Sequence, residues 1–77
     1  MANVVFPQLS VQVPTAEGVL ATWFVSDGDQ VASGQLLGEV MVDKVSGEVV
    51  APAAGRVHLL VAEEQTARQG DVIARVN

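Results

Sequence analysis

The sequence predicts an all-β domain, a flattened β-barrel or sandwich (a barrel-sandwich hybrid) made of two similar halves. Valine is the commonest residue, and Gly or Pro interrupts every long stretch, so helices are not expected. Short apolar runs are bounded by Gly, Asp, Asn and Pro, which is the pattern of strands joined by turns. A stretch in the first half of the chain also returns, with changes, near its end.

The apolar runs predict six strands and two short bridges, which is enough for a small sandwich or flattened barrel. The segment "SDGDQ" (26–30) has the Asp and Gly chemistry of a turn, and residues 8–18 are predicted to form a surface loop. The strands are expected near Val4–Phe6, Val19–Val25, Leu36–Val42, Val45–Val50, Arg56–Ala62 and Val72–Val76, with bridges near Val31 and Ala67.

The internal repeat aligns residues 17–40 with residues 54–76. Gly18 matches Gly55, residues 23–25 match 60–62, and after a one-residue gap residues 34–37 match 70–73. The second copy lacks the Gly28-Asp29 pair of the first. A short unit that cannot bury its apolar face alone can pair with a copy of itself, so we expect one domain over 1–77 with a quasi-twofold axis.

Composition excludes several classes of protein. The 77 residues include no cysteine, so neither a disulfide nor a thiolate zinc site can form, and a reducing compartment is favoured. The net charge of −5 and the scattered arginines argue against nucleic acid. No apolar run is long enough to span a membrane, and the start does not resemble a signal peptide. We expect the isolated domain to be monomeric.

Few other side chains suggest chemistry. His58 has no second histidine near it, so neither a metal site nor a catalytic triad is expected. Trp23 and Phe24 are neighbours in a predicted strand and should face opposite ways, one in the core and the other partly covered. Asp27 and Asp29 flank Gly28 as turn residues and do not match a calcium loop.

Lys44 is the sole lysine of the chain. Valines at 40, 42, 45 and 49 surround the Asp43-Lys44 pair, which predicts a hairpin with these two residues at its tip. A turn lysine is ordinarily just solvated, but a single exposed amine also offers a modifying enzyme one target without competitors.

The stretch "GEVMVDKVSGEVVAPAAGRV" (38–57) resembles the lipoyl-attachment segment of lipoyl domains, the swinging-arm modules of 2-oxo-acid dehydrogenase acyltransferases. The shared pattern is Asp43-Lys44 followed by the apolar-Pro-x-x-Gly run of residues 51–55. The resemblance extends to "FPQL" (6–9), "EGVLATWFVSDGDQV" (17–31) and "SGQLLGEV" (33–40). Gly28 and Gly55 lie where the family places glycines on either side of the modified lysine.

The resemblance implies that Lys44 carries lipoic acid through an amide, as a group carrier without catalytic residues of its own. Met41, Val42, Asp43 and Val45 would then be recognition neighbours of the lysine. It also implies a partner-recognition loop near the lysine, comprising Gln8, Leu9, Ser10 and Val11. Met41 replaces a frequent glutamate and Val45 a frequent alanine, so "MVDKV" is closer to branched-chain-type domains.

The partners implied are a lipoate ligase or octanoyl transferase, a 2-oxo-acid decarboxylase, an acyltransferase core domain and a dihydrolipoamide dehydrogenase. The compartment implied is the bacterial or archaeal cytoplasm, or the mitochondrial matrix. One alternative is a biotin carrier domain, whose lysine is flanked by methionines where Asp43 and Val45 stand here. The other is an unmodified barrel-sandwich interaction module.

Overall fold

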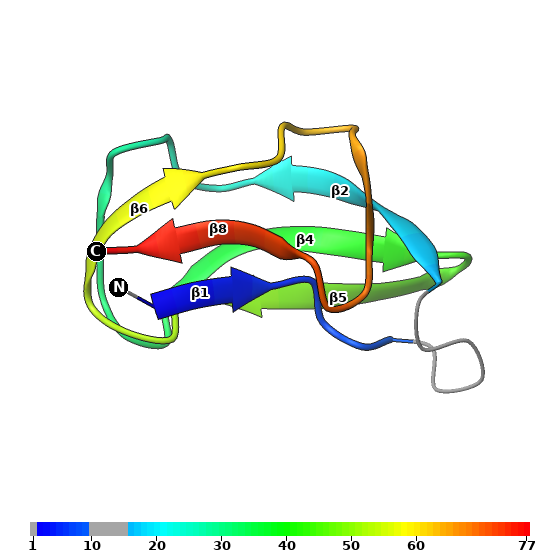
Figure 1. Ribbon diagram of the computed structural model, residues 1–77, viewed down its shortest axis with the longest axis horizontal. Coiled ribbons are helices and arrows are strands. Elements are labelled where there is room, and N and C mark those ends of the chain that lie inside the picture. Colours follow the sequence, from blue (N-terminus) through cyan, green and yellow to red (C-terminus); the bar gives the residue numbers. More distant parts are fainter. Residues whose placement is uncertain (1, 10–15) are drawn as a thin grey trace.

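The computed structural model describes residues 2–9 and 16–77, which form two antiparallel four-stranded sheets (Figure 1). One sheet has the strand order β1-β8-β6-β3 and the other has the order β5-β4-β2-β7. All the elements in these residues are strands, which confirms the predicted all-β class. Their bounds are β1 Ala2–Val5, β2 Glu17–Trp23, β3 Gln30–Val31, β4 Leu36–Val42, β5 Val45–Val50, β6 Gly55–Leu59, β7 Thr66–Arg68 and β8 Val72–Val76.

The predicted strands are present, but three of them end earlier than expected, β1 by one residue, β2 by two and β6 by three. β2 ends at Trp23 and β6 at Leu59, because the chain then enters turns closed by side chains. The Ser26 N–H donates to Asp29 Oδ2, and the Ala62 N–H donates to Gln65 Oε1. Turns that satisfy backbone groups in this way compete with the sheet ladder.

The two halves repeat the same backbone hydrogen bonds, with the donor residues 36 positions apart in sequence. Phe24 N–H donates to Leu37 O as Leu60 N–H donates to Ile73 O, and Gly34 N–H donates to Ala51 O as Gly70 N–H donates to Phe6 O. These pairs confirm the predicted two-half architecture.

The predicted alignment of the halves is wrong by one residue around Trp23. The ladder between β2 and β4 shifts between Leu20 and Thr22, so Ala21 is the extra residue of a β-bulge. The one-residue gap therefore lies within β2, ahead of Phe24. Phe24, and not Trp23, is the counterpart of Leu60.

The core lies between the sheets and consists of side chains from both of them. Phe6, Leu20, Leu37 and Ile73 are its largest fully buried members, and each contributes roughly 1.5–3 kcal/mol through burial. The other buried apolar residues are Val4, Val31, Val40, Val42, Val49, Ala51, Val57, Ala67, Ala74 and Val76.

The prediction for the aromatic pair is only partly confirmed. Trp23 is half-buried against the core, and its Nε1–H donates to Val61 O at 2.8 Å. Neither aromatic is fully buried as one of the pair was expected to be, and Phe24 is 54% exposed because it follows the last residue of β2. No helix in the described residues is long and apolar enough to cross a membrane.

Candidate functional site

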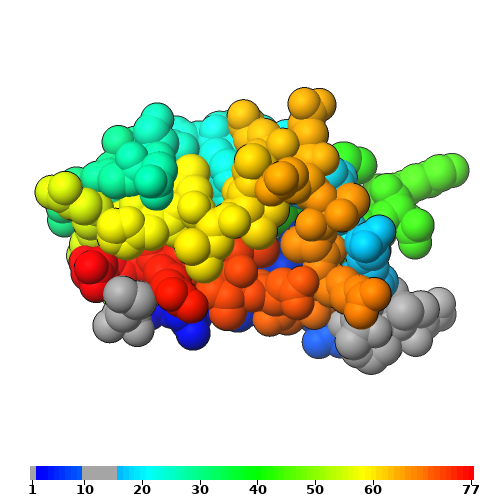
Figure 2. All heavy atoms as spheres, turned by 45° about the horizontal axis from the view of Figure 1, so that its top comes forward, coloured from blue at the N-terminus to red at the C-terminus, as the bar shows by residue number. Residues whose placement is uncertain are grey.

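The β4–β5 hairpin carries Lys44 at one end of the sandwich. Val42 pairs with Val45, which leaves Asp43 and Lys44 as a two-residue turn, as predicted. Asp43 has a φ of 53°, a left-handed conformation that aspartate tolerates better than most residues. Figure 2 shows the green hairpin segment standing out from the body of the molecule. The amine is therefore presented to solvent.

Buried valines anchor the base of the hairpin in the core. Val40 and Val42 on β4 are 0% and 3% exposed, and Val49 on β5 is 3% exposed. The residues nearer the tip face outward: Met41 is 38% exposed and Val45 is 50% exposed. A rigid base with an accessible tip fixes where an attachment enzyme finds the amine, at little entropic cost.

A shallow hollow of about 300 Å³ lies beside the turn on the outer face of the β4-β2-β7 part of the sheet. Met41 pairs with Val19, and Val19 pairs with Thr66, so these three residues form a row across the sheet. The hollow is lined by Glu17, Gly18, Val19, Met41, Asp43 and Thr66. Of the predicted recognition residues, Met41 and Asp43 thus share one concave surface, whereas Val42 is buried in the core.

The predicted recognition loop is described only at its first two positions, Gln8 and Leu9; Ser10 and Val11 lie outside the described residues. Gln8 is exposed, and Leu9 packs against the core. A Cβ added at Gly47 would lie 2.5 Å from Leu9 Cδ2, so Leu9 sits directly on β5. The structure therefore brings the start of the loop beside the strand that follows Lys44.

The two spacing glycines, Gly28 and Gly55, lie away from the hairpin. Gly28 has a φ of 90° and donates its N–H to Val57 O, while Gly55 pairs with Val31. A Cβ at Gly55 would collide with the Asn77 carbonyl. Their contacts are those of the turns and of the close packing between halves.

Sequence reasoning missed Gln69, which is buried (6% exposed) and accepts the Leu9 N–H through Oε1. A signal was available in the repeat, which aligns Gln69 with Ser33. A long amide side chain in one half thus replaces a short hydroxyl in the other, a change that the shared turn does not require.

The remaining candidates form no site. His58 lies on β6 opposite Arg75. The described residues contain no group of three metal-ligating side chains.

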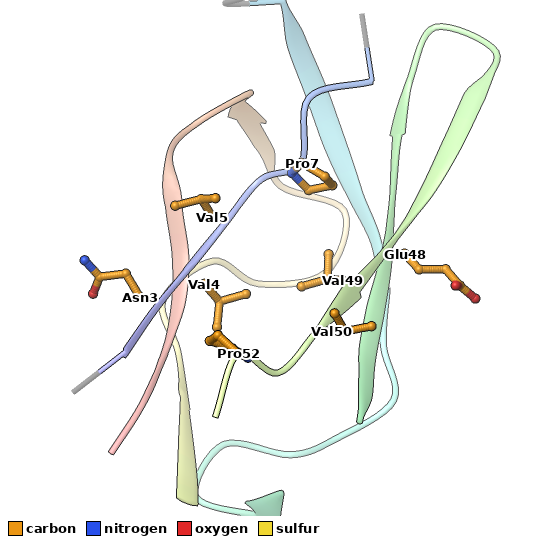
Figure 3. Close-up of a pocket in the computed structure, with 8 residues that line it drawn as sticks. All are labelled: Asn3, Val4, Val5, Pro7, Glu48, Val49, Val50 and Pro52. Carbon is orange, nitrogen blue, oxygen red and sulfur yellow. The ribbon is translucent and has the colours of Figure 1, made fainter. Parts of the chain in front are cut away.

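A second hollow, of about 250 Å³, lies where the edge strands β1 and β5 approach each other (Figure 3). It is lined by four pairs of residues that are equivalent in the two halves. The pairs are Asn3 with Glu48, Val4 with Val49, Val5 with Val50, and Pro7 with Pro52. This hollow is therefore a consequence of the quasi-twofold packing, and it borders neither Lys44 nor Asp43.

A two-sheet sandwich of repeated halves that presents one lysine at a hairpin tip defines a carrier-type β domain. The chain belongs to the Biotin_lipoyl family, described as "Biotin-requiring enzyme", whose pattern matches residues 2–76. The resemblance to lipoyl domains is confirmed by curated relatives and by a solved structure.

One relative is the lipoamide acyltransferase component of the branched-chain alpha-keto acid dehydrogenase complex of Bacillus subtilis, 39% identical over 71 residues. That match covers 91% of this chain and 16% of the relative. Another is the dihydrolipoyllysine-residue acetyltransferase component of the pyruvate dehydrogenase complex of Corynebacterium glutamicum, 39% identical over 75 residues, with 96% and 11% covered. The chain thus spans a small part of these relatives.

The solved structure is the lipoyl domain of the 2-oxoglutarate dehydrogenase complex of Azotobacter vinelandii. It superposes with a TM-score of 0.78 and 26% identity, covering 100% of this chain and 96% of that one. Because the matched structure is itself a lipoyl domain, the shared fold and family together support a lipoyl carrier role.

Proposed function

We propose that Lys44 is the attachment residue for lipoic acid and that the domain carries acyl groups within a 2-oxo-acid dehydrogenase complex. The observation that carries this proposal is the position of Lys44, the sole lysine, at the tip of a rigid hairpin in a lipoyl-type fold. The residues present fit the group, since the Lys44 side chain makes no hydrogen bond or ion pair with the described residues. Nothing in that part of the chain has to be broken before the amine reacts.

The attachment replaces a cation by a neutral amide. The Lys44 nitrogen would bond to the activated carboxyl carbon of lipoate, losing a proton as the activating group departs. When bound, the dithiolane would accept an acyl group and two electrons and later release both. Asp43 holds the turn in its left-handed conformation, and Val42 anchors it to the core, so these residues position the arm and do not react.

The partners proposed for this carrier follow from that chemistry. They are a ligase or octanoyl transferase for attachment, a 2-oxo-acid decarboxylase, an acyltransferase core domain and a dihydrolipoamide dehydrogenase. Tethering to the complex would give the arm an effective concentration on the order of millimolar at each active site. We place the domain in the compartment of such complexes, the bacterial or archaeal cytoplasm or the mitochondrial matrix. The domain itself is proposed to be non-catalytic.

The intact mass of the purified domain tests the proposal. Incubation with a lipoate ligase, lipoate and ATP should add one lipoyl increment, and the Lys44→Arg variant should gain none. Incubation with a biotin ligase, biotin and ATP is the matched control, because biotin domains place methionines beside the lysine where Asp43 and Val45 stand here. A biotin increment would favour a biotin carrier, and no increment with either enzyme would favour an interaction module.

A further inference from the structure

The first half of the chain contains an insertion that the second half lacks. Eleven residues separate Phe6 from Gly18, whereas three separate their counterparts Ala51 and Gly55. The equivalence of these positions follows from shared hydrogen bonds and pairings: Phe6 and Ala51 accept from Gly70 and Gly34, and Gly18 and Gly55 pair with Ala67 and Val31. The fold therefore closes one half without the extra residues.

Gln69 holds the chain at two positions within this insertion. Its Oε1 accepts the Leu9 N–H, and its own backbone N–H donates to Ala16 O at 3.2 Å. The next residue, Gly70, donates its N–H to Phe6 O at 2.9 Å. One turn of the second half thus holds the chain on each side of residues 10–15.

Leu9 passes this constraint to the hairpin. Its side chain rests on Gly47, where a Cβ would lie 2.5 Å from Leu9 Cδ2, and Gly47 is three residues beyond Lys44 on β5. Gln69 therefore holds the Leu9 backbone where the Leu9 side chain meets β5, the strand that follows Lys44.

Gln69 is also an exception to the symmetry of the molecule. Its counterpart Ser33 is exposed, whereas Gln69 is the buried polar residue of the described chain, at 6% exposure. Glutamine is mostly an exposed residue type, and a buried amide is tolerated when its polar atoms find partners. The turn forms in both halves, with a short exposed side chain in one of them, so the turn itself does not require a glutamine. The Gln69 side chain instead holds Leu9, within the insertion.

We propose that Gln69 is a positioning residue for partner recognition: it seats Leu9 on Gly47 and thereby fixes the surface that a 2-oxo-acid decarboxylase meets beside Lys44. This inference rests on the proposed carrier function. Loss of one neutral hydrogen bond should raise the KM for the lipoylated domain about five- to tenfold. The effect should be on the KM for the lipoylated domain, with kcat retained, because Gln69 touches no reacting atom.

The test uses Gln69→Met, which keeps the length of the side chain but removes the acceptor. Gln69→Glu retains an acceptor oxygen and should restore the KM. The matched control is Gln35→Met, since Gln35 Oε1 accepts the Ala32 N–H at an exposed turn at the far end of β4 from the hairpin. Each variant is lipoylated, its intact mass is recorded, and it is assayed as a substrate for a 2-oxo-acid decarboxylase that reductively acylates the wild-type domain.

An NMR spectrum of each variant reports the structural step, because the Leu9 amide should shift and lose exchange protection in Gln69→Met alone. A raised KM in Gln69→Met, with wild-type values in Gln35→Met and recovery in Gln69→Glu, supports the inference. An unchanged KM despite the altered Leu9 amide overturns it. Should Gln69→Met fail to fold, Gly47→Ala displaces Leu9 without touching Gln69 and must raise the KM in the same way. A wild-type domain that gains no lipoyl mass would instead refute the carrier function.

Discussion

The two halves of the sandwich share a ladder but differ at its ends. In one sheet β1 and β8 pair as far as Ala2 and Val76. The equivalent pair in the other sheet is Gly47 with Val40. There the ladder continues through the pairs Met41–Ser46 and Val42–Val45 to the Asp43-Lys44 turn. The extended hairpin and Leu9, at the start of the insertion after Phe6, lie close together, because Leu9 rests on Gly47. The ladder is thus common to both sheets, and the departures from symmetry gather around the lysine.

Displacing the tip of the hairpin should have the largest effect, which is the loss of lipoylation. A glycine inserted between Val42 and Asp43 lengthens the turn but leaves the buried valines in place, so we expect lipoylation to be abolished while the fold persists. The control inserts the same residue between Ala53 and Ala54, where the other half accommodates a longer segment, and should be lipoylated normally. Intact mass and a thermal denaturation curve measure the two effects. Full modification of the hairpin variant would contradict the positional argument.

Gly18, beside the hairpin, has no room for a side chain. A Cβ there would meet the Met41 carbonyl oxygen, Phe6 Cζ and Val42 Cγ2, which are backbone or core atoms that cannot easily move. Gly18→Ala should therefore destabilise the domain by about 1–3 kcal/mol.

Gly47→Ala is the contrasting variant, because the three atoms nearest to its new methyl group all belong to the Leu9 side chain, which can change rotamer. It should cost less than Gly18→Ala in the free energy of unfolding measured with urea. Equal costs would show that Leu9 is held as rigidly as the core.

The turns after β2 and β6 differ at one equivalent position. Both positions have a left-handed backbone, with a φ of 90° at Gly28 and of 67° at Glu64. The next residue in each turn, Asp29 or Gln65, accepts a backbone N–H through its side chain. Glu64→Gly should stabilise the domain, and Gly28→Ala should destabilise it, each by up to about 1 kcal/mol, because left-handed conformations favour glycine. Opposite shifts in melting temperature would confirm this, and shifts of the same sign would contradict it.

The sequence predicted the features whose causes are local. The valine-rich runs identified the strands, and Asp43-Lys44 between paired valines identified the hairpin. It did not reveal the bulge at Ala21, because the gap in a repeat can be placed at several positions until the hydrogen bonds are known.

Gln69 was missed for a different reason. Its partner Leu9 is 60 residues away in sequence, and glutamine is a residue type ordinarily assigned to the surface. The second half lacks a Gly-Asp pair, and there Glu64 and Gln65 form the equivalent turn with other side chains.

The smallest expected effect concerns Glu63, which joins the turn after β6 to β2. Its Oε2 accepts the Thr22 hydroxyl at 2.7 Å and the Trp23 N–H at 2.8 Å, and these two bonds lower the pKa of the carboxyl from its usual 4.5. A lowered folded-state pKa means that the stabilisation is present above the unfolded-state pKa and is lost as the pH falls through the folded-state pKa. Glu63→Gln should thus lower the melting temperature slightly at neutral pH, and the difference from wild type should shrink below about pH 4.

The neighbouring Glu64→Gln is the control for this change, since it removes the same charge from an exposed side chain at the adjacent position. Its melting temperature relative to wild type should vary less between pH 7 and pH 3. The first half repeats part of the Glu63 arrangement, because the corresponding residue Asp27 accepts the Leu59 N–H through Oδ1 at 2.8 Å. Each half thus uses a carboxylate to fasten its turn to a strand of the other, and Glu63 adds the hydroxyl of Thr22 to that link. A difference in melting temperature between Glu63→Gln and wild type that stays constant down to pH 3 would show that the charge of this carboxylate contributes nothing to the stability of the folded domain.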